Sequence, residues 1–272
     1  MTKSTGLLEI INGQYIARNE IEVNATPLEM EKLFQRIKSQ WKILGDHEPF
    51  WSVLNEESFK VKNIAENIPS NIKAFYDTGK DDVEKYEIFL SRAKLISPKG
   101  ICLEFGCGVG RATINLSGIF DKVIGVDISS GNLEIAEKYL RNENIENVNL
   151  IRLEEVHDIL NLPNFDVLFS FIVLQHNPPP VQKFILEALL QKINHGGICF
   201  IQLVADFPDY SFNVKDYLNL PIGIMDVHGF PMPVALDLFQ KHGFVIRDVR
   251  PDGWLGSYGS FTFLAERSLG IS

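Results

Sequence analysis

The chain has 272 residues, of which 45 % are hydrophobic and 22 % are charged, and its formal net charge is −9. This composition is ordinary for a globular protein with a sizeable core, and the length suits one core domain with added segments. Nucleic-acid binding needs clustered Lys and Arg, and a membrane span needs about 18 or more consecutive apolar residues, so the sequence predicts a protein that binds neither nucleic acid nor membrane. Its three cysteines have neither zinc-site nor CxxC spacing, which indicates reduced thiols in a cytoplasmic protein.

The first 99 residues are predicted to be mostly helical. Residues 26–29, Thr-Pro-Leu-Glu, fit a capping box with proline at the first helical position. Apolar residues then recur at helical spacing from Met30 to Leu44, and Gly45 is expected to end that helix. A turn is predicted at residues 47–51, and a second helix from Asp82 to Ile96.

From Gly100 onwards, short apolar runs alternate with amphipathic helices. This alternation predicts a parallel sheet that is covered by helices on both faces. The predicted strands are Ile101–Phe105, Lys122–Val126, Asn149–Leu153, Asp166–Phe171 and Ile198–Val204, and the helices between them are Arg111–Ile119, Gly131–Asn142 and Val181–Ile193.

The C-terminal part has a different pattern. A helix is predicted at Val234–His242, followed by two neighbouring strands, Phe244–Val249 and Ser260–Ala265, which would add one antiparallel strand to the sheet. Residues 205–231, rich in Pro, Asp and aromatic residues, do not fit the alternation. An irregular segment of this length in a compact domain is functional or disordered, and its apolar content argues against disorder.

A glycine-rich turn follows the first predicted strand of the core. Its sequence is Gly106-Cys-Gly108-Val-Gly110, and Arg111 stands where a dinucleotide-binding GxGxxG loop has its third glycine. Glu104 would repel a pyrophosphate but suits a cationic ammonium or sulfonium group, which argues against a nicotinamide-dependent oxidoreductase. Asp127, at the end of the next strand, suits the two hydroxyls of a ribose; the alternative role is a helix cap.

These segments resemble a known family. Glu104-Phe-Gly106-Cys-Gly108-Val-Gly110 resembles motif I of the class I S-adenosylmethionine-dependent methyltransferases, and Gly125–Ser129 resembles their second motif. Phe165–Ser170 and Leu174–His176 are similar to the fourth strand and the segment after it, and Asn194–Ile198 to the turn before the fifth strand. Five motifs in this order are specific for the superfamily but not for a substrate.

Together with the order of elements, the resemblance implies an α/β fold with a Rossmann-like, mostly parallel seven-stranded sheet, an antiparallel C-terminal hairpin, helices on both faces and a helical N-terminal extension. Residues 1–99 would form a cap or lid segment. Residues 100–272 would form the core that binds S-adenosylmethionine, with a substrate-lid insertion at residues 205–231.

The resemblance also implies a cofactor site. Glu104 would orient the ammonium of S-adenosylmethionine, Asp127 would hold its ribose, and Glu154, with Glu155 as the alternative, would meet the adenine edge. The complete set of residues expected to bind the cofactor is Glu104, Phe105, Gly106, Cys107, Gly108, Gly110, Asp127, Ile128, Asn132, Glu154, Glu155, Phe171 and Gln175.

The expected reaction is methyl transfer to an oxygen or nitrogen of a small-molecule acceptor, of sugar, glycan or natural-product type. A protein or RNA acceptor and a catalytically silent cofactor-binding partner remain the alternatives. The residues expected to contact the acceptor or form its lid are Phe50, Trp51, Tyr76, Lys80 and Tyr210. A hydroxyl acceptor needs a base, for which His176 is the first candidate and His228 the second. No metal site is expected.

Overall fold

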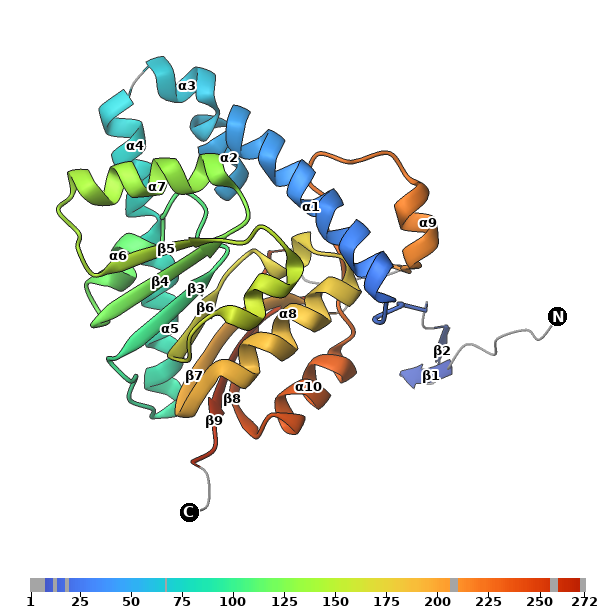
Figure 1. Ribbon diagram of the computed structural model, residues 1–272. Coiled ribbons are helices and arrows are strands. Elements are labelled where there is room, and N and C mark those ends of the chain that lie inside the picture. Colours follow the sequence, from blue (N-terminus) through green and yellow to red (C-terminus); the bar gives the residue numbers. More distant parts are fainter. Residues whose placement is uncertain are drawn as a thin grey trace.

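The computed structural model describes residues 8–11, 14–17, 20–66, 68–205, 210–254 and 259–269. A seven-stranded sheet runs through its centre in the order β5-β4-β3-β6-β7-β9-β8 (Figure 1). β9 is antiparallel to both of its neighbours, and the remaining neighbouring strands pair in parallel. The strands are β3 (Ile101–Phe105), β4 (Lys122–Asp127), β5 (Val148–Arg152), β6 (Phe165–Ser170), β7 (Ile193–Val204), β8 (Phe244–Pro251) and β9 (Ser260–Arg267). The predicted fold class is confirmed.

Each face of the sheet has its own apolar core. Side chains of β3 alternate between the two: Cys102 packs with the helices on one face, and Leu103 and Phe105 pack with those on the other. Helices α5 (Gly79–Ala93) and α6 (Thr113–Ser117) cover the first face, and α8 (Pro179–Lys192) and α10 (Met232–Lys241) cover the second. The nearly continuous apolar strands of the sequence therefore reflect burial on both sides.

The strand β7 is longer than predicted. It begins at Ile193 rather than Ile198, because Ile193 pairs with Phe165 before an irregularity in the register, after which Ile198 pairs with Val167. The predicted turn at residues 194–198 therefore lies within the strand, with Gly196 at a φ of +77°.

The first helix predicted in the N-terminal segment is present, and the capping box predicted at its start is confirmed. Thr26 Oγ1 accepts a hydrogen bond from the Glu29 amide at 3.3 Å, and Glu29 Oε2 accepts one from the Thr26 amide at 2.9 Å. The segment also has an antiparallel pair of strands that the sequence did not predict, β1 (Leu8–Ile11) and β2 (Gln14–Ala17). Its helices are α1 (Pro27–His47), α2 (Pro49–Val53), η1 (Glu57–Phe59), α3 (Val61–Glu66) and α4 (Ile68–Asp77), followed by α5.

The predicted end of the first helix at Gly45 is wrong. α1 continues to His47, and Gly45 lies where it crosses the start of α7 (Ser130–Asn142). A Cβ atom at Gly45 would lie 2.0 Å from Ser129 Oγ, so the glycine permits close helix packing and does not mark a helix end. The predicted turn at residues 47–51 is also wrong in part, because α2 starts at Pro49, a residue favoured at the first helical position.

The insertion at residues 205–231 was expected to be irregular, but it contains a short helix, α9 (Val214–Asn219). Asn213 caps it by accepting a hydrogen bond from the Asp216 amide at 3.1 Å. α9 contacts α1, so the insertion lies beside the N-terminal helix (Figure 1). Residues 206–209 of the insertion lie outside the described residues.

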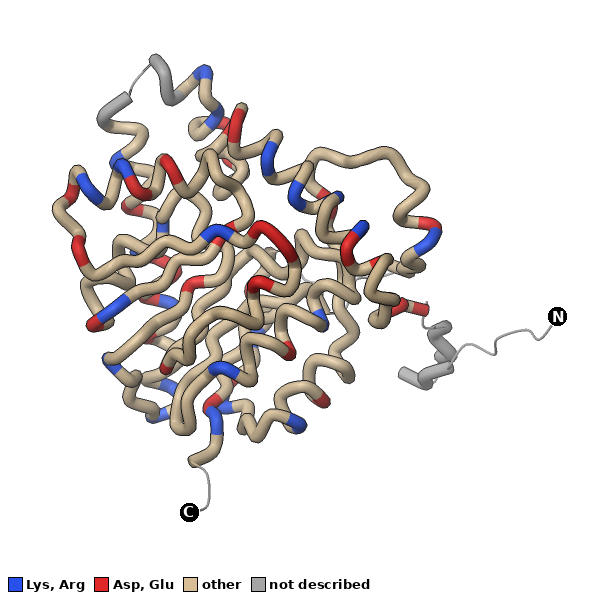
Figure 2. The backbone as a smooth tube through the Cα atoms, viewed as in Figure 1, with Lys and Arg blue, Asp and Glu red and all other residues tan. Residues whose placement is uncertain are grey.

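Charged residues are spread over the surface. Figure 2 shows Lys and Arg interspersed with Asp and Glu on the helices and strand ends. Many of them form pairs one helical turn apart, such as Lys42 with Asp46 and Lys73 with Asp77. Within the part of the chain that the structure describes, no helix is long and apolar enough to span a membrane.

Candidate functional site

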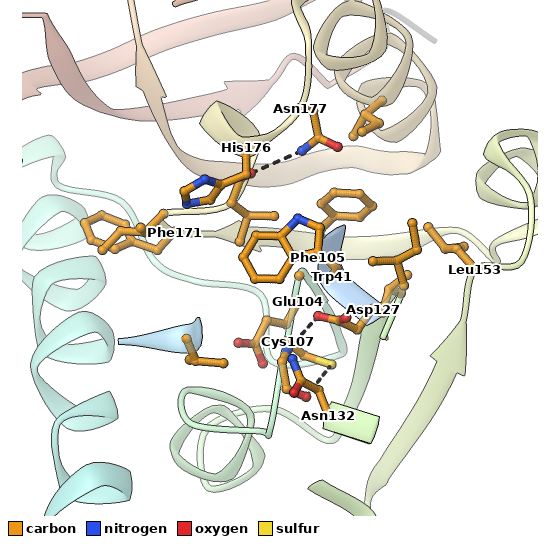
Figure 3. A pocket seen from close by; sticks show the side chains of 18 of the residues that line it. Trp41, Glu104, Phe105, Cys107, Asp127, Asn132, Leu153, Phe171, His176 and Asn177 are labelled. Carbon is orange, nitrogen blue, oxygen red and sulfur yellow. Dashed lines mark hydrogen bonds between the residues drawn. The ribbon is translucent and has the colours of Figure 1, made fainter. Parts of the chain in front are cut away.

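A cavity of about 1030 Å³, including its part open to solvent, lies at the carboxyl ends of β3, β4 and β6. Because parallel strands bring these ends to one edge of the sheet, the segments that follow them meet there. The cavity is lined by the glycine loop after β3, by Asp127 at the end of β4, and by residues 171–173 after β6 (Figure 3). α1 and α2 of the N-terminal segment cover it.

The structure brings many of the predicted site residues to this cavity, but not all of them. Those that line it are Glu104, Phe105, Gly106, Cys107, Gly108, Asp127, Ile128, Asn132, Phe171 and His176. Those that do not line it are Gly110, Glu154, Glu155, Gln175, His228, Phe50, Trp51, Tyr76, Lys80 and Tyr210. The first set comes mainly from the motifs of the core, and the second mainly from the segments proposed as lids.

The three glycines of the loop have left-handed backbone conformations. The φ angles are +78° at Gly106, +54° at Gly108 and +87° at Gly110, a region that other residues rarely adopt. Two of them also lack room for a side chain: a Cβ at Gly106 would lie 2.3 Å from Val173 Cγ1, and one at Gly108 would lie 2.5 Å from Val53 Cγ2. The loop backbone therefore packs closely against Val173 and Val53, and residues 106–108 of the loop line the cavity.

Asp127 fixes the glycine loop. Its Oδ2 accepts a hydrogen bond from the Gly108 amide at 2.8 Å, and its Oδ1 accepts one from the Ser129 amide at 2.8 Å. Ser129, not Asp127, caps α7, because its hydroxyl accepts from the Asn132 amide at 3.3 Å. Burial raises the pKa of Asp127, and these backbone donors oppose the shift. The carboxylate lies at the cavity wall, where a ligand with hydroxyl groups can reach it (Figure 3).

Glu104 is a buried carboxyl group on the cavity wall, and Thr113 Oγ1 donates a hydrogen bond to it. Burial raises its pKa to about 8, and the hydrogen bond from Thr113 and the charge of Arg111 offset only part of that shift. Near neutral pH this side chain is therefore largely protonated. A cation that binds beside it would stabilise the charged form.

Arg111 and Asp82 form a buried ion pair at the same end of the cavity, and both line it. Arg111 also donates to Thr78 Oγ1 at 3.3 Å, and its Nε has no hydrogen-bond partner among the described residues. Asp82 comes from α5, so the N-terminal segment supplies a charged group to the site. Its side chain is held by an arginine distant in sequence, and no local pattern indicated this role.

The polar groups of the cavity suit S-adenosylmethionine. Glu104 and Asp127 can accept hydrogen bonds from an ammonium group and from ribose hydroxyls. Asn132 adds a buried carbonyl oxygen, Oδ1, that has no hydrogen-bond partner among the described residues. Buried polar atoms are nearly always paired, so an unpaired one at a cavity wall indicates a place for a ligand or water donor.

The two acidic residues predicted to meet the adenine edge do not line the cavity. Glu154 is exposed and forms ion pairs with Lys38 at 2.7 Å and Arg152 at 2.9 Å, and Glu155 is also exposed. The preceding residue, Leu153, lines the cavity instead. The acidic residues after β5 therefore belong to the surface, and the cavity wall there is apolar.

His176 lies on the cavity wall opposite the glycine loop, with 5 % of its surface exposed. Its Nδ1 is 2.9 Å from the backbone oxygen of Asp226, and its ring meets the Trp41 ring edge-on at 5.3 Å between centroids. Burial lowers the pKa of His176. The imidazole is therefore neutral near pH 7 and can accept a proton.

His228 is buried behind His176 and does not line the cavity. Its Nδ1 is 2.8 Å from the hydroxyl oxygen of Tyr210, and its backbone N–H donates to the Gln175 oxygen at 2.7 Å. Burial lowers its pKa to about 4. The predicted residues His228 and Tyr210 therefore contact each other within the insertion, and only the backbone oxygen of Gln175 bonds to them, because its side-chain amide has no hydrogen-bond partner among the described residues.

The predicted lid residues of the N-terminal segment do not gather at the cavity. Phe50 and Tyr76 belong to an aromatic cluster with Phe59 and Phe75. The Tyr76 ring stacks on the Tyr139 ring, with 3.5 Å between the ring centroids. The Tyr76 hydroxyl donates to the Val109 oxygen at 2.9 Å, so this cluster packs the segment onto the glycine loop. On the surface, Lys80 pairs with Asp77 at 2.6 Å, and Lys60 lies 5.8 Å from the centre of the Trp51 ring.

Several cavity residues were not predicted. α1 contributes Phe34, Ile37 and Trp41, and α2 contributes Ser52 and Val53. The spacing of apolar residues in α1 indicates that one face of this helix is buried. It does not indicate which surface that face covers.

Comparison with known proteins agrees with the motifs. A family described as a methyltransferase domain matches residues 102–197. A ubiquinone biosynthesis O-methyltransferase of Nitrosococcus oceani is 24 % identical over 234 residues, which cover 83 % of this chain and 84 % of that protein. A protein of the same name from Pelagibacter ubique is 25 % identical over 227 residues, covering 80 % and 84 %. An uncharacterized protein of Rickettsia prowazekii is 34 % identical over 101 residues, 36 % of this chain and 40 % of that one.

Solved structures share the fold. The magnesium protoporphyrin IX methyltransferase of Synechocystis PCC 6803 with bound SAH has a TM-score of 0.57 and 16 % identity, covering 86 % of this chain and 100 % of that one. The [4+2]-cyclase SpnF has a TM-score of 0.54 and 13 % identity, covering 93 % and 100 %. The domain match spans the glycine loop, Asp127, Asn132 and His176. With this match and the architecture of the sheet, the chain contains a methyltransferase domain with the fold of the class I S-adenosylmethionine-dependent methyltransferases.

Proposed function

We propose that this chain transfers the methyl group of S-adenosylmethionine to a hydroxyl oxygen of a small, largely apolar acceptor, and that an aromatic hydroxyl is favoured. The observation that carries the proposal is the buried imidazole of His176, whose pKa is lowered by burial, on the wall of the cavity that also contains Glu104 and Asp127. The names of the relatives, O-methyltransferases of ubiquinone biosynthesis, support an oxygen acceptor. Fold alone does not decide the reaction, since a cyclase shares it.

In this proposal the cavity holds two molecules, the cofactor and the acceptor, and different residues of the chain contact each of them. Glu104 holds the cofactor ammonium, Asp127 the ribose hydroxyls, and Ile128 and Leu153 flank the adenine. The cofactor supplies a methyl group already activated by its sulfonium, so alignment contributes much of the rate. His176 would take the hydroxyl proton of the acceptor as the acceptor oxygen bonds to the methyl carbon and the bond between that carbon and sulfur breaks, which leaves S-adenosylhomocysteine.

The character of His176 supports an acidic hydroxyl. Its pKa lies below the ordinary 6.5, which makes it a weak base. A phenol, with a pKa of about 10 as in tyrosine, gives up its proton to such a base far more readily than an aliphatic alcohol does. The apolar side chains of Phe34, Ile37 and Trp41 along the same cavity suit an aromatic ring better than a sugar.

Acceptor choice is tested with matched compounds that carry a phenol, an aliphatic alcohol or an amine on the same ring. With S-adenosylmethionine present, mass spectrometry should detect the addition of one methylene mass to the phenols, with faster turnover than for the alcohols. Transfer to the amines alone would overturn the assignment of an oxygen acceptor. Binding of S-adenosylhomocysteine without transfer to any member of a broad panel would support a catalytically silent protein.

Cofactor affinity should depend on the protonation of Glu104. Because its pKa is about 8 in the ligand-free protein, binding of an ammonium beside it should release a proton. Affinity for S-adenosylhomocysteine should therefore rise as the pH increases from about 6 towards 8, up to tenfold per pH unit, and calorimetry in buffers of different ionisation enthalpy should detect proton release. In Glu104→Gln both the affinity and its pH dependence should be lost. Equal affinity at both pH values in the wild type would contradict this role.

Glu104 should also affect the stability of the ligand-free protein. Since the folded state raises its pKa from 4.5, the folded protein binds this proton more tightly, and stability from this group falls as the pH rises from 4.5 towards about 8. Glu104→Gln should therefore be less sensitive to pH in chemical denaturation over this range. This second measurement separates loss of the carboxylate from loss of the fold.

A further inference from the structure

His176 is held by groups that do not belong to the methyltransferase core motifs. Its Nδ1 lies 2.9 Å from the backbone oxygen of Asp226, in the insertion, and Trp41 of α1 packs against its ring. A backbone oxygen can only accept a hydrogen bond, so Nδ1 must carry the proton for this contact to form. In the neutral ring that leaves Nε2 unprotonated, which is the form required of a base.

The position of Asp226 is itself determined by two donors. Gln40 Nε2 of α1 and the Tyr217 hydroxyl of α9 each donate to Asp226 Oδ2 at 2.8 Å. Gln40 is buried, with 3 % of its surface exposed. Together these bonds hold the carboxylate between α1 and α9, and thereby hold the backbone oxygen of the same residue towards His176.

The same helix fastens the segment that leads into Asp226. Arg36 Nη1 donates to the Leu220 oxygen at 2.7 Å, and its guanidinium lies 4.4 Å from the centre of the Tyr217 ring. Arg36 also donates to the Pro221 oxygen. α1 and the insertion therefore form one hydrogen-bonded unit, and this unit ends at the imidazole.

We propose that Gln40 and Tyr217 are positioning residues, which act through Asp226 to fix His176 in the tautomer with the proton on Nδ1. The N-terminal extension and the insertion thus prepare the base, in addition to covering the cavity. The tautomer part of this proposal rests on the hydrogen bonds alone. The kinetic part rests on the proposed function, because it requires His176 to take a proton from the acceptor.

The tautomer is measured directly by nitrogen-15 NMR of protein labelled at histidine, which distinguishes a protonated ring nitrogen from an unprotonated one. In the wild type, His176 should carry its proton on Nδ1, with its signal assigned from the spectrum of His176→Gln. In Gln40→Leu and in Tyr217→Phe, the second of which removes only a hydroxyl, the signal should shift towards a mixture of tautomers. kcat should fall about tenfold with the acceptor KM changed much less, the loss expected from one weakened hydrogen bond.

Gln35→Leu is the matched control, because Gln35 is an exposed glutamine on the same helix. It should leave both the tautomer and kcat unchanged. A wild-type His176 with its proton on Nε2, or a Gln40→Leu variant with unchanged tautomer, would overturn the proposal. Equal effects in Gln35→Leu would do the same, since they would reflect general damage to α1. If His176→Gln retains full activity while the tautomer behaves as described, the base assignment fails and the positioning geometry stands.

Discussion

Gly106→Ala should abolish cofactor binding and strongly lower the free energy of unfolding. The backbone of Gly106 has a φ of +78°, where an L side chain costs about 1–2 kcal/mol. The new Cβ would also lie 2.3 Å and 2.5 Å from the two methyl carbons of Val173. Val173 cannot retreat easily, because Ile172 before it already has a φ of +60°, a strained conformation for a β-branched residue.

The control for this substitution is Gly243→Ala. Gly243 has nearly the same backbone, with a φ of +75°, but no atom lies within 4 Å of the position of a Cβ. This variant should therefore lose only the free energy of unfolding that the strained backbone costs, about 1–2 kcal/mol in chemical denaturation. Its affinity for S-adenosylhomocysteine, measured by calorimetry, should be unchanged. Similar losses of stability and affinity in the two variants would mean that contact with Val173 does not matter.

The core of the fold and much of the cavity lining could be predicted from the sequence because the determinants are local. A loop such as Gly106-Cys-Gly108-Val-Gly110 requires positive φ angles within a few residues, and the strand before it and the helix after it define its place. Asp127 follows at the end of the next parallel strand, so the topology alone brings it to the same edge of the sheet. For the glycine loop and Asp127, the order and spacing of the strands along the chain are therefore enough to predict that they meet at one edge of the sheet.

The N-terminal segment could not be placed in this way. Phe50 and Tyr76 were predicted to contact the acceptor or form its lid. Only the tertiary structure determines that they belong to one aromatic cluster, in which Tyr76 stacks on Tyr139. Trp41 was predicted as part of a helix face, but its contact with His176 joins residues distant in the chain. The surface ion pairs of Glu154 likewise depend on Lys38 of α1. In each case the partner lies more than a few turns away in sequence, beyond the reach of periodicity.

His176→Gln should lower kcat by about a hundredfold or more with a phenolic acceptor, while the affinity for S-adenosylhomocysteine stays the same. Glutamine is polar and of similar size, but it cannot take up a proton near neutral pH. His176 does not belong to the glycine loop or to the Asp127 contacts, so cofactor binding should not depend on it. Stopped-time assays and calorimetry on the same preparation measure both quantities.

The pH profile of the wild type provides a second, independent measurement. The neutral imidazole is the active form, and burial lowers its pKa below 6.5, so kcat should rise with pH to a plateau with a midpoint below 6.5. His176→Gln should lack this step. The matched control is His157→Gln, because His157 is exposed. This variant should keep both the wild-type kcat and its dependence on pH.

His228→Gln distinguishes the two histidines that the sequence offered as bases. His228 is buried, its Nδ1 contacts the Tyr210 hydroxyl, and it does not line the cavity. Its substitution should therefore lower stability in denaturation more than it lowers kcat per folded molecule. If kcat instead falls as far in His228→Gln as in His176→Gln, with the tautomer of His176 unchanged, the proton of the acceptor passes to His228 within the insertion, and the cavity must open towards it during the reaction.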